Sequence, residues 1–381
     1  MKKSMFKVVA LMLTVALFAF CFAGCGNNGG NEEGYTSSNT ELFIGGTGPL
    51  TGDASSYGVS VQNGAKLAIK EINNAGGLNG IKFKFDMKDD KAAAADAATG
   101  YDTLYEAGMQ ASIGSVTSGA CESFASKADE DQIFAITPSA SAANVIENRP
   151  TVFRVCFGDP DQGYLAAEEL NKSYKKIGVI YDTSDAYSSG IYEAFSEKMK
   201  ELGTEFNTQT FDAENKKDFT TQVEALKDCD VIFLPIYYTE AGTIAKTSAA
   251  KGCKAVLFGC DGLDGVAEQI DSSVTNQIKY ITPFDVNSSD EKTKAFVEAY
   301  RAEYGSDPDQ FAADGYDAVM SIFEAMKKAD VKDVKISAKD LAKILVKTYT
   351  NGLEYKGATG TMTWDETGAC AKVPQIVELG K

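Results

Sequence analysis

The sequence predicts an α/β protein of two doubly wound, parallel-sheet lobes that are joined by a three-segment hinge. The first observation is that short apolar strands alternate with amphipathic helices from Leu42 onward. The second is that this alternation runs through two similar units, one after the other. The third is a return to helices after residue 286 and to strands after residue 349. We therefore expect the chain to cross between the lobes near residues 157, 286 and 350, in a hinge that permits closure.

The first 24 residues are predicted to be an export signal. The cationic start MKKSMFK precedes an apolar run, 8–20, that is too short to cross a bilayer. The run ends in FAGC, which is typical of a lipoprotein processing site; ordinary cleavage after a small residue is the alternative. Cys25 would then carry the lipid, and the polar residues 25–40 would form a flexible tether. This predicts a lipid-anchored protein on the extracytoplasmic face of the cell membrane, in a bacterium with a single membrane.

Lobe 1 is predicted to consist of residues 41–157 and 287–349. Its opening segment, FIGGTGPLTGDASSYGVSVQNGAKLAIKEINNAGGLNG, reads as a strand, a glycine-rich loop and a helix. The loop follows the carboxyl end of a strand, where open α/β sheets bind ligands, so Tyr57 is a candidate ligand contact. Strands and helices are expected in alternation at 43–46, 59–74, 82–87, 91–107, 110–114, 120–129 and 133–136, with later helices at 290–304, 312–329 and 338–349.

Lobe 2 is predicted to consist of residues 158–286 and 350–381. Helices and strands are expected in alternation at 161–173, 176–181, 187–202, 205–211, 218–228, 231–236, 239–250 and 255–258. The segment IKYITPFDV follows at 278–286. The chain is expected to end in a hairpin formed by GATGTMTWDETG and KVPQIVEL.

Composition excludes several classes of function. The formal net charge is −17, and removal of residues 1–24, with three lysines and no acid, would make it −20. Such a charge repels phosphate backbones, so we expect no nucleic acid partner. The chain has no histidine, which removes histidine-based nucleophile and zinc sites, and the glycine loop matches neither GxGxxG nor a Walker pattern. We expect neither an enzyme nor a cofactor or metal, and leave open whether Cys229 and Cys253 form a disulfide.

Polar and aromatic residues follow the predicted strands on the edges where two sheets would face each other. They are Ser118, Ser139, Ser141, Tyr187, Tyr237 and Asp261, and Ala140 is the candidate between the two serines of its loop. Hydroxyls and helix-start amides suit a carboxylate, and Asp261 suits an ammonium, which together complement a free amino acid. Several of them also have a structural alternative: Ser118, Ser141 and Asp261 could cap helices. Tyr187 and Tyr237 could be core residues. Asp264 is the rival of Asp261 as the ammonium partner.

The chain resembles the leucine/isoleucine/valine-binding proteins of branched-chain amino acid importers over nearly all of residues 41–380. Besides the opening segment, the matching stretches are IGSVTSG, ITPSASA, FRVCFGDPDQG, the Tyr187 loop, Tyr237-Tyr238 and TWDETG. The resemblance implies a type I periplasmic binding protein. It implies that Ser118 and Ser141 hold the ligand carboxylate, and that the Ser139 backbone and Asp261 hold the ammonium. Tyr57, Tyr187 and Tyr237 would shape the pocket.

Two departures from that family leave the ligand open. Asp261 stands where glutamate is usual and is about 1.5 Å shorter, and Ser139 and Ser141 stand where alanine and threonine are common. Branched-chain amino acids are the leading expectation, with aromatic or small polar amino acids, amides and urea as alternatives. The expected function is a monomeric receptor that delivers its ligand to the permease subunits of an ABC importer. A sensory binding protein of the same fold is the alternative, disfavoured because the sequence ends at Lys381 without a further span or domain.

Overall fold

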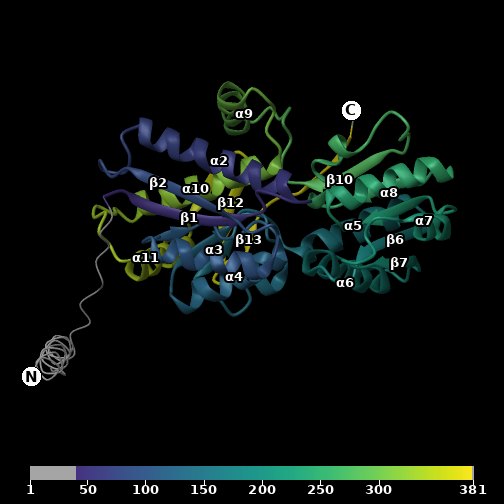
Figure 1. The fold of residues 1–381 in the computed structure, drawn as a ribbon, viewed down its shortest axis with the longest axis horizontal. Coiled ribbons are helices and arrows are strands. Elements are labelled where there is room, and N and C mark those ends of the chain that lie inside the picture. The colour runs from purple at the N-terminus through teal and green to yellow at the C-terminus, as the bar shows by residue number, and fades with distance from the viewer. Residues whose placement is uncertain (1–39, 380–381) are drawn as a thin grey trace, which may run out of the picture. The chain divides into compact units, whose positions relative to one another are not determined.

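A computed structural model describes residues 40–379 (Figure 1). The first sheet of the fold is parallel throughout. Five strands lie in the order β2-β1-β3-β4-β5. Their bounds are β1 (Leu42–Gly48), β2 (Phe83–Asp89), β3 (Ala111–Ser112), β4 (Phe134–Thr137) and β5 (Val152–Arg154). Every residue of β1 is buried, and a Cβ at Gly45 would lie 2.4 Å from the Met109 sulfur, so a larger residue there would displace this side chain. The sequence did not predict β5, which has only three residues.

Helices cover this sheet, and two of them from distant parts of the sequence pack closely together. The bounds are α2 (Ser55–Asn74), α3 (Ala94–Glu106), α4 (Ser118–Glu130), α9 (Glu291–Tyr304), α10 (Gln310–Lys328) and α11 (Ala338–Thr350). A Cβ at Gly64 of α2 would clash with the Ala312 carbonyl oxygen, and one at Gly315 of α10 would lie 2.5 Å from the Val61 carbonyl oxygen. The two glycines therefore allow α2 and α10 to touch along their backbones, and this contact fixes the start of α10 beside the middle of α2.

The second sheet has six strands in the order β14-β10-β9-β8-β6-β7. Their bounds are β6 (Ile177–Asp182), β7 (Asn207–Phe211), β8 (Val231–Leu234), β9 (Val256–Gly259), β10 (Ile278–Thr282) and β14 (Gln375–Glu378). All pairs are parallel except β10 with β14. The helices of this part are α5 (Asp159–Ser173), α6 (Ala186–Glu201), α7 (Thr220–Leu226) and α8 (Tyr238–Lys251), with short 3₁₀ helices at η2 (Asp261–Leu263) and η3 (Val266–Gln269); a third, η1 (Ala143–Val145), follows β4.

The end of the chain differs from the predicted hairpin. A separate three-stranded sheet forms from β11 (Glu354–Gly357), β12 (Gly360–Trp364) and β13 (Cys370–Ala371), whereas β14 pairs with β10. This small sheet packs against α10 and α11, because the Trp364 ring lies 4.7 Å from the Tyr349 ring and the Trp364 indole N–H donates to the Arg154 carbonyl oxygen at 2.7 Å. The expected crossing near residue 350 was therefore placed too early, since β11 to β13 pack on the first sheet's helices and the chain joins the second sheet only at β14.

Within residues 40–379, no helix has the length and apolar character needed to cross a bilayer. The predicted signal, the Cys25 lipidation site and nearly all of the tether lie outside the described residues.

Candidate functional site

A small cavity lies where the carboxyl-end loops of the two sheets meet. Its empty volume is about 240 Å³, counting space open to solvent. The lining residues come from both halves of the fold and are Tyr57, Val116, Thr117, Ser118, Ser139, Tyr187, Tyr237, Asp261, Gly262 and Phe311. Six of the eight ligand contacts predicted from the sequence are among them; Ala140 and Ser141 are fully buried beside the cavity and do not line it.

The start of α4 forms one end of the cavity. Thr117 is the N-cap residue of α4, but its side chain makes no capping hydrogen bond, and its buried hydroxyl has no partner within residues 40–379. Ser118 is the first residue of the helix, and its hydroxyl accepts a hydrogen bond from the Ala142 N–H at 3.2 Å. The first amides of a helix lack intrahelical acceptors and carry the positive end of its dipole. This end of the cavity therefore offers donors to an anion.

The segment after β4 is held by its own side chains. The Ser139 hydroxyl donates to the Val116 carbonyl oxygen at 2.8 Å, and the Ala140 N–H donates to the Thr137 hydroxyl at 3.0 Å. The Ser141 hydroxyl is buried and has no hydrogen-bond partner among the described residues. Neither Ser118 nor Ser141 caps a helix with its side chain, so the capping alternative does not account for them.

Tyr57 links the two halves of the fold. It lies in the first turn of α2 rather than in the expected loop, and only 2% of it is exposed. Its hydroxyl donates to the Gly262 carbonyl oxygen at 2.5 Å and accepts from the Tyr238 N–H at 3.1 Å. The ring packs 4.2 Å from Phe311 and 4.9 Å from Tyr238. The sequence did not single out Phe311, because it does not follow a predicted strand. Tyr57 is thus both a wall of the cavity and a contact between the sheets.

Asp261 lies at the acidic side of the cavity. Its Oδ1 accepts from the Tyr187 hydroxyl at 2.7 Å, and its backbone N–H donates to Gln162 Oε1 at 3.1 Å. Burial raises the pKa of Asp261 to about 6, against the opposing hydrogen bonds from Tyr187 and Gln162. The Tyr187 and Tyr237 rings stack at 5.0 Å beside it.

Asp264, the rival acid, lies outside the cavity lining. Its carboxylate accepts from the Gln310 N–H at 3.1 Å and from the Tyr280 hydroxyl at 3.4 Å. Asp261 is therefore the better placed of the two for a ligand in the cavity.

Sequence reasoning missed two charged residues next to the site. Asp159 begins α5 and is 1% exposed, and Arg154 ends β5 with its guanidinium donating to the Ser141 and Ala142 carbonyl oxygens. Both lie in the stretch FRVCFGDPDQG, which begins within β5 and runs into α5. The signal that could have found Asp159 is its position as an acid at the start of a helix near the expected crossing at 157.

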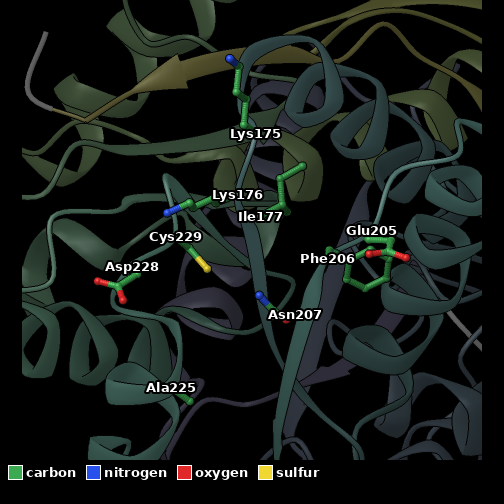
Figure 2. Close-up of a pocket in the computed structure, with 9 residues that line it drawn as sticks. All are labelled: Lys175, Lys176, Ile177, Glu205, Phe206, Asn207, Ala225, Asp228 and Cys229. Atoms are coloured by element: carbon green, nitrogen blue, oxygen red, sulfur yellow. The ribbon is translucent and has the colours of Figure 1, made fainter.

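A second, larger hollow lies at the opposite edge of the second sheet (Figure 2). It is lined by Lys175, Lys176, Ile177, Glu205, Phe206, Asn207, Ala225, Asp228 and Cys229. Its residues stand at the amino ends of β6 and β7 and before β8, away from the edge where open sheets bind ligands. In Figure 2, Lys175 points away from the other labelled side chains, so the charged groups do not converge on one point.

The described residues hold six cysteines, and all six are free, Cys229 and Cys253 included. Within the same residues, no group of three or more His, Cys, Asp or Glu side chains is arranged to hold a metal ion.

Comparison with known proteins places this geometry in a family. The sequence pattern of the periplasmic binding proteins matches residues 41–373. The chain belongs to the periplasmic binding protein family. It is 28% identical over 375 residues to the Leu/Ile/Val-binding protein homolog 1 of Brucella abortus (strain 2308), covering 97% of this chain and 93% of the relative.

Solved structures agree on the fold. The branched-chain amino acid transporter substrate-binding protein LivJ from Streptococcus pneumoniae, in complex with isoleucine, superposes with a TM-score of 0.77 at 28% identity, covering 89% of this chain and 99% of that one. A solute-binding protein of an ABC transporter from Rhodopseudomonas palustris BisB5, in complex with 3,4-dihydroxybenzoic acid, gives 0.78 at 21% identity, covering 89% and 93%. The fold is that of a type I periplasmic binding protein with parallel-sheet lobes, as the sequence predicted. Proteins of this family and fold bind substrates and are extracytoplasmic.

Proposed function

We propose that the protein captures a free amino acid in the cavity and presents it to the permease subunits of an ABC importer. The observation that carries this proposal is that one cavity is lined by hydrogen-bond donors at the start of α4 and by the buried carboxylate of Asp261. An α-amino acid carries a carboxylate and an ammonium on one carbon, so it can satisfy both ends at once. Ser118, Ser139, Ala140 and Ser141 belong to the carboxylate end in this proposal, and Asp261 with the Ser139 backbone to the ammonium end.

The aromatic walls favour an apolar side chain. Tyr57, Tyr187, Tyr237 and Phe311 surround the cavity with aromatic rings, which pack well against an apolar side chain. The Streptococcus pneumoniae relative was solved with isoleucine, which supports a branched-chain amino acid as the first ligand to test. The Rhodopseudomonas palustris protein shares the fold alone, and the aromatic acid that it holds shows how far ligands vary on this scaffold.

Ligand contact with both sheets would favour the closed form, because Tyr57 already meets Gly262 and Tyr238 across the cavity. We propose that the protein acts as a monomer, with residues 158–286 moving against residues 41–157 and 287–349. We also propose that Cys25 carries a lipid that holds the protein on the outer face of the membrane. Replacement by alanine (Cys25→Ala) should then release the protein from the membrane fraction, and a variant that stays bound would refute the anchor.

The test is a thermal-shift screen of the protein against the twenty L-amino acids, acetamide, urea and benzoate. The proposal expects leucine, isoleucine or valine to give the largest rise in melting temperature. An amide or urea as the best ligand would refute amino acid capture while leaving the fold and a transport role in place.

A further inference from the structure

Three charged side chains meet at a contact between the two halves of the fold. Lys216 Nζ lies 3.3 Å from Asp53 Oδ2 and 3.3 Å from Glu240 Oε1. Asp53 belongs to the loop between β1 and α2, beside the first sheet. Lys216 lies between β7 and α7, and Glu240 in the first turn of α8, both beside the second sheet. The lysine therefore bridges the two halves.

Neighbouring contacts place this cluster next to the cavity. The Thr239 hydroxyl donates to the Asp53 carbonyl oxygen at 2.9 Å. The preceding residue, Tyr238, donates its N–H at 3.1 Å to the hydroxyl of Tyr57, which lines the cavity. The three charged residues are not among those that line the cavity, so they lie where the halves meet without reaching a ligand inside.

The two acids differ in how far they are buried. The Glu240 side chain is 10% exposed and the Asp53 side chain 69%, with Lys216 between them at 32%. Burial raises the pKa of Glu240 and the charge of Asp53 adds to the rise, whereas Lys216 opposes it. Burial by itself would lower the pKa of Lys216, but Glu240 and Asp53 together raise it. Lys216 is thus the cation that both acids share.

This arrangement makes closure depend on Lys216. Lys216 and Glu240 both belong to the second sheet's connections, so their pair persists when the sheets move apart, whereas Asp53 belongs to the other half. Closure brings the Asp53 carboxylate toward Glu240, and two like charges at such range repel each other. With Lys216 between them, the same approach becomes favourable.

We propose that Lys216 is an ionic clasp, which holds the two halves together over the bound ligand and slows its release without touching it. This inference rests on the proposed function, because it requires a ligand that both halves enclose. A single exposed ion pair contributes little, but this lysine serves two acids and one of them is mostly buried, so the expected effect is moderate.

The experiment measures the affinity and the dissociation rate of the L-amino acid that gives the largest thermal shift, by calorimetry and stopped-flow fluorescence. Lys216→Met should bind it about three- to tenfold more weakly, mainly through faster dissociation, because Asp53 and Glu240 then face each other without a cation. Adding Asp53→Asn to Lys216→Met should recover about twofold or more of the affinity. A role of Lys216 within its own half would not respond to Asp53, which lies in the other half.

Lys198→Met is the matched control. Lys198 also pairs with two acids, Glu168 at 3.1 Å and Glu201 at 3.4 Å, and its side chain is 25% exposed. All three residues lie on α5 and α6, within one half of the fold, so the affinity should stay within about twofold. Salt gives a second readout: at about 1 M NaCl, where the Debye length is about 3 Å, the difference between the parent and Lys216→Met should shrink.

The outcomes separate the clasp from the proposed function. Equal affinity and equal dissociation rates in the parent and Lys216→Met would refute the clasp while leaving amino acid capture intact, and so would a loss that Asp53→Asn does not reverse. If Lys216→Met does not fold, Asp53→Lys carries the test, since it keeps the Lys216–Glu240 pair but sets a second cation opposite Lys216. It should bind more weakly than the parent, and equal binding refutes the clasp. If no L-amino acid binds the parent protein, the proposed function is wrong and this inference with it.

Discussion

Two regions of this molecule bury acidic side chains, and they differ in how completely those carboxylates are paired. Between β13 and β14, Lys372 forms an ion pair with Asp314 at 2.8 Å, and the two side chains are 1% and 3% exposed. Beside it, Asp317 accepts hydrogen bonds from the Ala358 and Thr359 amides and from two hydroxyls. Among the described residues around the cavity, in contrast, the Asp159 carboxylate oxygens have no hydrogen-bond partner, and the Asp261 carboxylate is held by hydrogen bonds from Tyr187 and Gln162 rather than by an ion pair.

This difference in pairing distinguishes carboxylates that stabilise the fold from carboxylates that can bind a ligand. A buried carboxylate that serves the fold is neutralised within the chain, because an unpaired charge is costly. A carboxylate that is left incompletely paired in a cavity keeps its capacity for a ligand cation. The comparison therefore predicts that substitutions in the two regions act on different quantities: stability at Lys372 and affinity at the cavity.

The largest expected effect is at Lys372. Lys372→Met should lower the free energy of unfolding by about 3–5 kcal/mol, because it leaves Asp314 buried without its cation. Denaturant unfolding measures this change. Adding Asp314→Asn should recover part of the loss, and Lys356→Met, which breaks an exposed pair with Asp290, should have little effect. A Lys372→Met protein as stable as the parent would contradict the claim that this buried ion pair stabilises the fold.

A smaller effect is expected at Tyr57. Tyr57→Phe keeps the ring against Phe311 but removes the hydroxyl that joins α2 to Gly262 and Tyr238. On the proposal that closure forms them, two hydrogen bonds at about 0.5–1.5 kcal/mol each suggest an affinity loss of roughly five- to a hundredfold. Calorimetry gives the affinity. Small-angle scattering should show a ligand-induced decrease in the radius of gyration of the parent, and an unchanged radius would contradict closure.

The last expected effect is a dependence of stability on pH. Burial raises the pKa of Asp185 and Asp261 to about 6 and of Asp309 and Asp314 to about 7, all above the usual value of 3.8. The folded state then binds more protons than the unfolded state between about pH 4 and 7, so the free energy of unfolding should rise as the pH falls through this range. Thermal melts of the protein without ligand at pH 7.5, 6.5 and 5.5 test the sign. A melting temperature that falls steadily over this range would contradict it.

The sequence predicted the fold better than it predicted the acidic side of the site. The spacing of apolar residues and the positions of turn-forming residues located most strands and helices, such as α9 and α8, to within a few residues. Both patterns are local in the sequence. The position of β11 to β13 depends on where Trp364 packs, which is a long-range contact with Tyr349 and Arg154 that no local pattern encodes. Asp159 was missed for the same reason, since its burial follows from contacts with Ser141 and Gly190. The residues after strand ends were found because topology alone brings them to one edge.

The most direct test of the account is the affinity of Asp261→Asn for the best L-amino acid, measured beside the parent and Asp264→Asn. Asp261 lines the cavity, whereas Asp264 contacts Gln310 and Tyr280 outside it. The account predicts that Asp261→Asn binds about ten- to a hundredfold more weakly, with little change in the melting temperature of the protein without ligand, and that Asp264→Asn is affected far less. Equal affinity in Asp261→Asn and the parent would contradict the assignment of this cavity as an amino acid site.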